Sequence, residues 1–177
     1  MMGIRKSSSK FITETERLKF RPFEMEDFSS LCVLDKDPEV RQFFPDGVLT
    51  EDQIKKNIEK NIKSWEHLGY SDFIVIEKET DLFIGRAGFS NYQDSDIEVG
   101  YLFLKAAWGK GYATEAVQGL LKWAASNLNT NRIIAFAPIN HLASQKVLEK
   151  SGMKYFQTEK HKGIDCRFYE ILLSSII

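Results

Sequence analysis

The 177-residue chain has few cysteines, no long apolar run and no long basic tract. Its two cysteines, Cys32 and Cys166, have neither metal-ligand spacing nor the spacing of a disulfide framework, which favours a reduced, intracellular chain. No apolar run approaches membrane-spanning length, and the basic N-terminus lacks the apolar core of a signal peptide. The formal net charge is −1, so nucleic acid is not an expected partner. We therefore expect a cytoplasmic globular protein with no membrane partner and no metal.

Neither an internal repeat nor a long linker divides the chain. We expect residues 1–12 to form a flexible arm and residues 13–177 to form a single domain. The patterns predict strands over 17–23, 72–77, 82–89, 97–104, 132–137, 153–160 and 166–173, and helices over 24–35, 50–67, 113–128 and 142–150. Helices between strands, with hairpin-like pairs at both ends, predict a mixed α/β sheet.

The most informative stretch, residues 97–128, has the pattern of a strand, a glycine-containing turn and an amphipathic helix. The turn is Trp108-Gly109-Lys110-Gly111-Tyr112-Ala113. Glycines let backbone N–H groups approach a ligand, and the first N–H groups of the helix stabilise an anion. Lys110 adds a positive charge, so pyrophosphate is the expected ligand. The turn alone is equally compatible with a tight connection that binds nothing, and its spacing matches neither a P-loop nor a dinucleotide-binding motif.

Several ordered motifs together resemble the GNAT superfamily of acyl-CoA N-acyltransferases, and most closely its RimJ/RimL-like branch of ribosomal-protein N-acetyltransferases. The superfamily signature Gln/Arg-x-x-Gly-x-Gly/Ala falls on residues 108–113, with tryptophan in first place as is common in this branch. The branch's opening motif ERLxxRPxxxED stands at 16–27 and its DPEV at 37–40. NHLASQKVLEKSGM follows at 140–153. The resemblance covers roughly residues 15 to 173.

This resemblance implies a GNAT fold, with a mixed, mostly antiparallel sheet of about seven strands and flanking helices. Two central strands, ending near Leu104 and beginning near Arg132, would splay apart. The cosubstrate would be acetyl-CoA, with its pantetheine arm in the gap, paired with the backbone of Leu102, Phe103 and Leu104. The remaining cosubstrate contacts would come from Trp108, Gly109, Lys110, Gly111, Tyr112, Ala113 and Thr114. We expect Trp108 to pack beside the turn.

Direct acetyl transfer in a ternary complex requires a base for the amine and a proton for the leaving thiolate. Glu98 occupies the family's E-x-G-Y position, where related enzymes are proposed to withdraw the proton, often through water. The alternative is a carboxylate that bonds to a neighbouring strand or faces solvent. Asp96 is an inferior candidate, because its expected loop position fixes its geometry less well. The resemblance therefore implies Glu98 as the catalytic base.

The proton donor is harder to assign. Many GNAT proteins have a tyrosine where this chain has Leu148, which cannot donate. Ser144 aligns with the serine of the branch's Asn-x-x-Ser, and it would donate directly, donate through water, or merely cap the helix. Asn140 stands one residue early and His141 occupies the usual asparagine place, so either the chain bulges or His141 contacts pantetheine. His141 also remains open as a second base, whereas the tyrosines are expected to be packing residues or pocket walls: Tyr101, Tyr155 and Tyr169.

The acceptor is the least determined part. An α-amine titrates near 8 and a lysine near 10.4, so freeing a lysine amine at neutral pH costs about 3 kcal/mol more. A protein or peptide N-terminal α-amine is therefore favoured, and residues 40–67 are expected to line the acceptor side. A small-molecule amine, such as an antibiotic or polyamine, and a catalytically silent CoA-binding module remain alternatives. The oligomeric state is left as monomer or homodimer.

Overall fold

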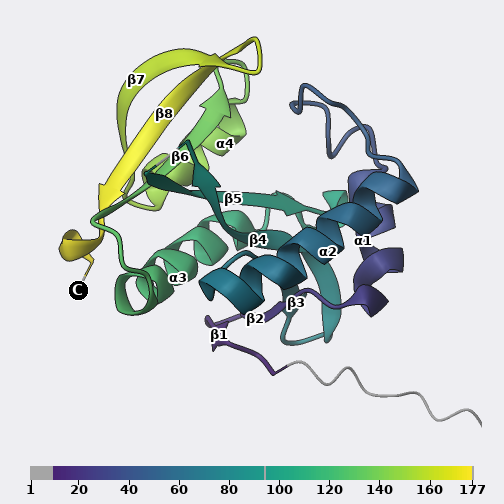
Figure 1. The fold of residues 1–177 in the computed structure, drawn as a ribbon. Helices are drawn as coiled ribbons and strands as arrows, with labels where there is room; N and C mark the ends of the chain where they lie inside the picture. The colour runs from purple at the N-terminus through teal and green to yellow at the C-terminus, as the bar shows by residue number, and fades with distance from the viewer. Residues whose placement is uncertain (1–9, 94, 177) are drawn as a thin grey trace, which may run out of the picture.

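The computed structural model describes residues 10–93 and 95–176, so most of the expected arm lies outside the described residues. The described residues form one eight-stranded sheet in the order β1-β2-β3-β4-β5-β6-β8-β7. Every pairing is antiparallel except β5 with β6. The predicted mixed, mostly antiparallel α/β sheet is confirmed (Figure 1).

The strands are β1 Thr13–Glu14, β2 Leu18–Pro22, β3 Asp72–Glu77, β4 Leu82–Tyr92, β5 Asp96–Phe103, β6 Arg132–Pro138, β7 Lys154–His161 and β8 Ile164–Leu172. The α-helices are α1 Phe28–Asp35, α2 Glu51–Leu68, α3 Tyr112–Asn127 and α4 Leu142–Lys150. Short 3₁₀ turns are η1 Met25–Asp27, η2 Lys105–Ala107 and η3 Leu173–Ser175.

Two details differ from the sequence expectation. The eighth strand is β1, whose two residues pair with Phe20 and Lys19 and are too short to give a sequence pattern. The expected loop before the central strand is shorter, because β4 continues to Tyr92 and pairs with Asp96 at the start of β5. Asp96 is thus a strand residue, and it forms a two-point ion pair with Arg132 (both 3.0 Å).

The sheet has a hydrophobic cluster on each face. One cluster joins α3 to the sheet through side chains such as Phe73, Val99 and Phe103. The other joins α1 and α2 to Ile74 and Leu102, which point to the opposite face because strand side chains alternate. Helices α1 and α2 therefore lie over one face and α3 over the other (Figure 1).

Helix α2 begins and ends with strong local signals. Thr50 Oγ1 accepts from the N–H of Gln53 (3.2 Å), and Gln53 Oε1 accepts from the N–H of Thr50 (2.8 Å), which completes the capping box. Gly69 ends the helix with φ +75°. The helix is thereby fixed over the face that it shares with α1.

The centre of the sheet opens between β5 and β6. These parallel strands pair only at Ile97 with Ile133 and at Glu98 with Ile134. Beyond Glu98 they separate, and β6, β8, β7 and α4 form the upper-left part of Figure 1. The splayed central pair implied by the family resemblance is therefore present.

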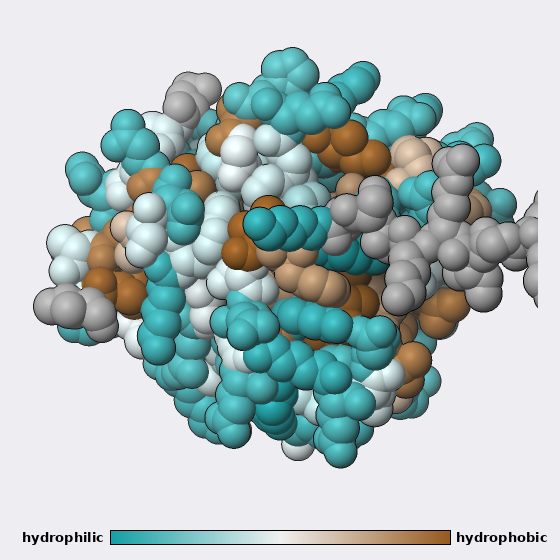
Figure 2. All heavy atoms as spheres, turned by 90° about the horizontal axis from the view of Figure 1, so that it is seen from below, coloured by the Kyte–Doolittle hydropathy of each residue, from teal (hydrophilic) through white to brown (hydrophobic). Residues whose placement is uncertain are grey.

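The face seen in Figure 2 is mostly hydrophilic, and its apolar side chains gather in small, separate patches among the coloured atoms. No helix within residues 10–93 and 95–176 is long and apolar enough to cross a bilayer.

Candidate functional site

The turn before α3 adopts a conformation that requires glycine. Gly109 and Gly111 have φ values of +73° and +80°, in the left-handed region that other residues rarely adopt. Gly111 is the N-cap of α3, and no side chain caps the helix. The first N–H groups of Tyr112, Ala113 and Thr114 are therefore left for another acceptor. This end of the helix is suited to an anion.

The side chains around the turn are positioned by the N-terminal strands. Arg17 Nε donates to Glu115 Oε2 (2.6 Å), and Arg17 Nη1 donates to Lys110 O (2.9 Å). The guanidinium carbon lies 4.4 Å from the centre of the Tyr112 ring. The Lys110 ammonium has no hydrogen-bond or ion-pair partner within the described part of the chain. The turn thus carries two positively charged side chains: Arg17, which hydrogen bonds hold in place, and Lys110, which has no such partner among the residues described.

The backbone of β5 faces the gap at alternate residues. Leu104 N–H donates to Ile84 O (2.9 Å) and Leu104 O accepts from Ala107 N–H (2.8 Å). Hydrogen-bonded pairs alternate along an antiparallel ladder, so the backbone groups of Leu102 also point to β4. Those of Tyr101 and Phe103 point to the gap. Of Leu102, Phe103 and Leu104, only Phe103 presents its backbone where a pantetheine arm was expected.

Trp108 lies at the end of this gap. Its Nε1–H donates to Phe103 O (3.0 Å), while its side chain stays 44% exposed. The indole therefore packs beside the turn and occupies one lone pair of the carbonyl that faces the gap.

Glu98 lies at the point where β5 and β6 separate. Its Oε1 accepts from Ser90 Oγ (2.8 Å) on the neighbouring strand β4. Burial raises the pKa of Glu98 to about 7; the Ser90 hydrogen bond opposes this shift, and the negative charge of Asp72 adds to it. A carboxyl that titrates near neutral pH and is fixed by one hydrogen bond is suited to accept a proton.

Ser144 is in α4, and its hydroxyl forms a hydrogen bond with Tyr101 of β5. Tyr101 Oη lies 2.7 Å from Ser144 Oγ, and either hydroxyl can donate. Ser144 is inside α4, whose N-cap is His141, so its hydroxyl does not cap the helix. Burial raises the pKa of Tyr101 to about 12, which keeps the phenol protonated at neutral pH. Tyr101, Tyr155 and Tyr169 were expected to pack or to form pocket walls; Tyr155 and Tyr169 bond to Thr158 and Glu149.

The turn between β6 and α4 holds the two residues at the usual asparagine place. Asn140 is exposed, whereas His141 stacks on Phe43 with ring centres 3.8 Å apart and an interplanar angle of 9°. Burial lowers the pKa of His141, so the imidazole is neutral at pH 7. Buried Gln145 fixes the turn by donating to Pro138 O and Ile139 O (both 3.0 Å). His141 thereby joins this turn to the segment that follows α1.

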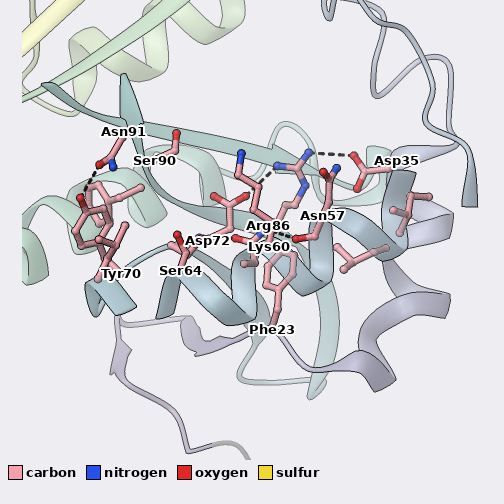
Figure 3. A pocket seen from close by; sticks show the side chains of 16 residues that line it. Phe23, Asp35, Asn57, Lys60, Ser64, Tyr70, Asp72, Arg86, Ser90 and Asn91 are labelled. Carbon is pink, nitrogen blue, oxygen red and sulfur yellow. Dashed lines mark hydrogen bonds and ion pairs between the residues drawn. The ribbon is translucent and has the colours of Figure 1, made fainter. Parts of the chain in front are cut away.

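A cavity of about 300 Å³ lies beneath α2 (Figure 3). Glu98 is on the same face of β5 as Leu102, which packs towards α1 and α2, because strand side chains alternate. Ser90, the hydrogen-bond partner of Glu98, is in the cavity wall. Most of its polar lining comes from α2, β3 and β4, namely Asn57, Lys60, Asn61, Ser64, Asp72, Arg86 and Asn91. Residues 40–67, which were expected to line the acceptor side, supply part of this wall.

A network of charged side chains forms the floor of the cavity. Arg86 donates to Asp35 (3.0 Å) and Asp72 (3.3 Å), and Figure 3 shows the three side chains in line. Arg41, which is 3% exposed, donates to Asp35 (2.9 Å) and Asp46 (2.8 Å). Burial raises the pKa of Asp72, with the charge of Arg86 opposing. In the cavity wall itself, Asp35 and Asp72 face Arg86 and Lys60, so the formal charges of the charged lining balance.

The comparisons with known proteins agree with this geometry. Residues 17–154 match the family model of the acetyltransferase (GNAT) domain. The chain is 33% identical over 167 residues to the uncharacterized N-acetyltransferase p20 of Bacillus licheniformis, covering 89% of this chain and 94% of p20. A solved GNAT-family acetyltransferase from Bacillus anthracis has 30% identity and a TM-score of 0.80, covering 93% of this chain and 99% of that one. The chain therefore belongs to the GNAT family and is an N-acetyltransferase.

The structural neighbours include a RimL-type enzyme. The solved complex of RimL, a ribosomal L7/L12 alpha-N-protein acetyltransferase, with coenzyme A has a TM-score of 0.78 at 17% identity. The match covers 92% of this chain and 98% of RimL. At that identity the likeness shows the shared fold.

The structure brings the predicted residues to one gap from both sides. Glu98 lies at its closed end, the turn at 108–114 at its outer end, and Ser144 on the α4 side. Sequence reasoning missed the partners of these residues, namely Arg17, Ser90, Tyr101 and Phe43. Arg17 and Tyr101 had a signal, since Arg17 stands in the opening motif and Tyr101 in the E-x-G-Y motif. No group of three His, Cys, Asp or Glu side chains able to hold a metal occurs among the residues described.

Proposed function

We propose that this enzyme transfers an acetyl group from acetyl-CoA to a primary amine, and that its favoured acceptor is a protein or peptide N-terminal α-amine. The observation that carries the proposal is the position of Glu98. A half-buried carboxyl with a pKa of about 7 stands where the central strands separate, beside a polar cavity on one face. A hydroxyl pair, Tyr101 and Ser144, stands on the other side of the gap.

The chemical groups that these residues offer match those of acetyl-CoA. The uncapped start of α3, the two left-handed glycines and the free ammonium of Lys110 suit a diphosphate. The backbone groups of Tyr101 and Phe103 suit the amides of a pantetheine arm, much as an open strand edge suits another strand. We place these contacts at 101 and 103, in preference to Leu102 and Leu104.

The proposed reaction has two proton transfers, one on each side of the gap. The amine nitrogen bonds to the thioester carbon, and the carbon–sulfur bond breaks. Glu98 accepts the proton that the nitrogen loses, directly or through water. Ser144 donates a proton to the departing sulfur and regains one through Tyr101, which recovers its own proton from solvent.

The acceptor preference follows from matched pKa values. Moving a proton from an α-ammonium, which titrates near 8, to a carboxyl near 7 costs about 1 kcal/mol. The same transfer from a lysine ammonium near 10.4 costs about 5 kcal/mol. The α-amine is also the acceptor named for the RimL neighbour.

A small polar amine is the second candidate acceptor, and the cavity favours it. Its volume of about 300 Å³ is at the lower limit for small-molecule sites, and its lining is rich in amide and hydroxyl groups.

An acceptor panel tests the proposal. Peptides with free or blocked N-termini and small polar amines are each incubated with acetyl-CoA, and mass spectrometry scores the acetylated product. We expect acetylation of free α-amines. Turnover on small amines alone would select the second candidate. Thermal stabilisation by coenzyme A without any turnover would mean a silent CoA-binding module.

A further inference from the structure

The side chain of Arg17 reaches the turn before α3 from a distant part of the chain. Arg17 precedes β2, yet it bonds to Glu115 and Lys110 O and covers the ring of Tyr112. Its Nη2 atom lies 3.4 Å from the place where a Cβ of Gly111 would stand. Arg17 is therefore in contact with the left-handed glycine that opens the helix.

The guanidinium keeps spare hydrogen-bonding capacity at this place. Arginine has five N–H donors, and here Nε and one Nη1 hydrogen are engaged. Nη2 has no acceptor within the residues described, and the side chain is 42% exposed. Both nearby carboxylates are already hydrogen-bonded, Glu115 by Thr15 and Arg17 and Glu77 by Tyr112 and Thr80. The outer edge of the guanidinium is thus open beside the uncapped helix start.

We infer that Arg17 binds the phosphate groups of the cosubstrate, so that it both holds the turn and contributes to the site. This inference rests on the proposed function, because it takes acetyl-CoA as the ligand of the turn. Arg17 and Lys110 would then supply positive charge to one diphosphate. The planar donor edge of arginine suits phosphate oxygens, and the bond to Glu115 fixes its orientation in advance.

A purely structural role for Arg17 makes a different prediction. If Arg17 only holds the turn, breaking its ion pair from either side should have the same effect on the cosubstrate. If it meets phosphate, removing its charge should cost more than removing the Glu115 carboxylate, which leaves the guanidinium in place. The difference should also disappear for a ligand that has no phosphate.

Calorimetric titration of the full chain with coenzyme A and with pantetheine tests this inference. Arg17→Met keeps the side-chain stem over Tyr112 and should weaken coenzyme A binding about tenfold or more. The matched control Glu115→Gln should change that affinity less than about threefold. Pantetheine, which lacks the phosphates, should bind all three proteins alike.

Two results would overturn the inference. One is an equal loss for Arg17→Met and Glu115→Gln, and the other is coenzyme A binding by Arg17→Met that matches the unmodified protein. If Arg17→Met fails to fold, Arg17→Gln replaces it, and a loss beyond that of Glu115→Gln again supports phosphate contact. Absence of coenzyme A binding by the unmodified protein would instead reject the proposed function itself.

Discussion

The glycine turn before α3 and the cavity beneath α2 offer different parts of the chain to a ligand. At the turn, the groups offered to a ligand are backbone N–H groups, whose direction Gly109 and Gly111 determine. In the cavity they are side chains, and most of the charged ones already pair with one another, as Arg86 does with Asp35 and Asp72. A backbone site fits one ligand shape, whereas paired side chains can exchange partners when a ligand enters. The turn therefore suits a constant cosubstrate, and the cavity suits a variable acceptor.

Glu98 is outside the turn and borders the cavity only through Ser90, so its substitution should slow the reaction and leave both regions intact. Glu98→Gln should lower kcat/KM about 100-fold or more, because it removes the proton acceptor. In the unmodified enzyme, activity should rise with pH through about 7, and this acidic limb should be absent from the variant. Affinity for coenzyme A should stay the same. A pH profile that survives in the variant would reject Glu98 as the base.

The same variant gives a readout that needs no acceptor. The pKa of Glu98 is raised to about 7 in the folded protein, against about 4.3 in an unfolded chain. Below the lower value the carboxyl is protonated in both states and its burial carries no penalty. As the pH rises from about 4 to 7, the unfolded state gains ionisation that the folded state resists. The unmodified protein should therefore lose stability relative to Glu98→Gln across this range in denaturant unfolding.

A substitution at Gly111 should disrupt the turn and leave the cavity beneath α2 unchanged. Gly111→Val forces a branched side chain into a φ of +80° and crowds Arg17, so coenzyme A affinity should fall about tenfold or more. Gly163→Val is the matched control, because Gly163 has a φ of +79° in the β7–β8 hairpin with open space around it. Both variants should lose stability, but only the first should lose affinity in calorimetry. Equal affinities would mean that the turn does not bind phosphate.

The hydroxyl pair across the gap should act as one unit. Tyr101→Phe and Ser144→Ala should each lower kcat about tenfold without weakening coenzyme A binding, because each removes part of the route by which a proton reaches the sulfur. The double variant should be no slower than the slower single variant. Multiplied losses in single-turnover measurements would show two independent roles.

The sequence predicted the regions that are continuous in the chain. The strand, turn and helix over 97–128 could be predicted because glycine positions and apolar spacing are local features of the sequence. Glu98 and Ser144 were proposed as catalytic residues because each stands in a short sequence motif. The cavity could not be predicted, because Asp72 and Arg86 meet through the pairing of β3 with β4 and Asp35 reaches them from α1. Nor could the stacking of Phe43 on His141, which joins segments almost a hundred residues apart. Strand β1 could not be predicted for the same reason, since its two residues form a strand only through their pairing with Phe20 and Lys19.

The smallest effects should come from the side chains that set the pKa of Glu98 from the cavity side. Asp72→Asn removes a negative charge that raises this pKa, so the acidic limb of kcat/KM should move to lower pH. Ser90→Ala removes a hydrogen bond that lowers it, so the limb should move to higher pH. Asp72→Asn should also raise the KM of a cationic acceptor about twofold to threefold, because it removes a carboxylate from the floor. Shifts of the limb in the same direction for both variants would show that the cavity does not control the base.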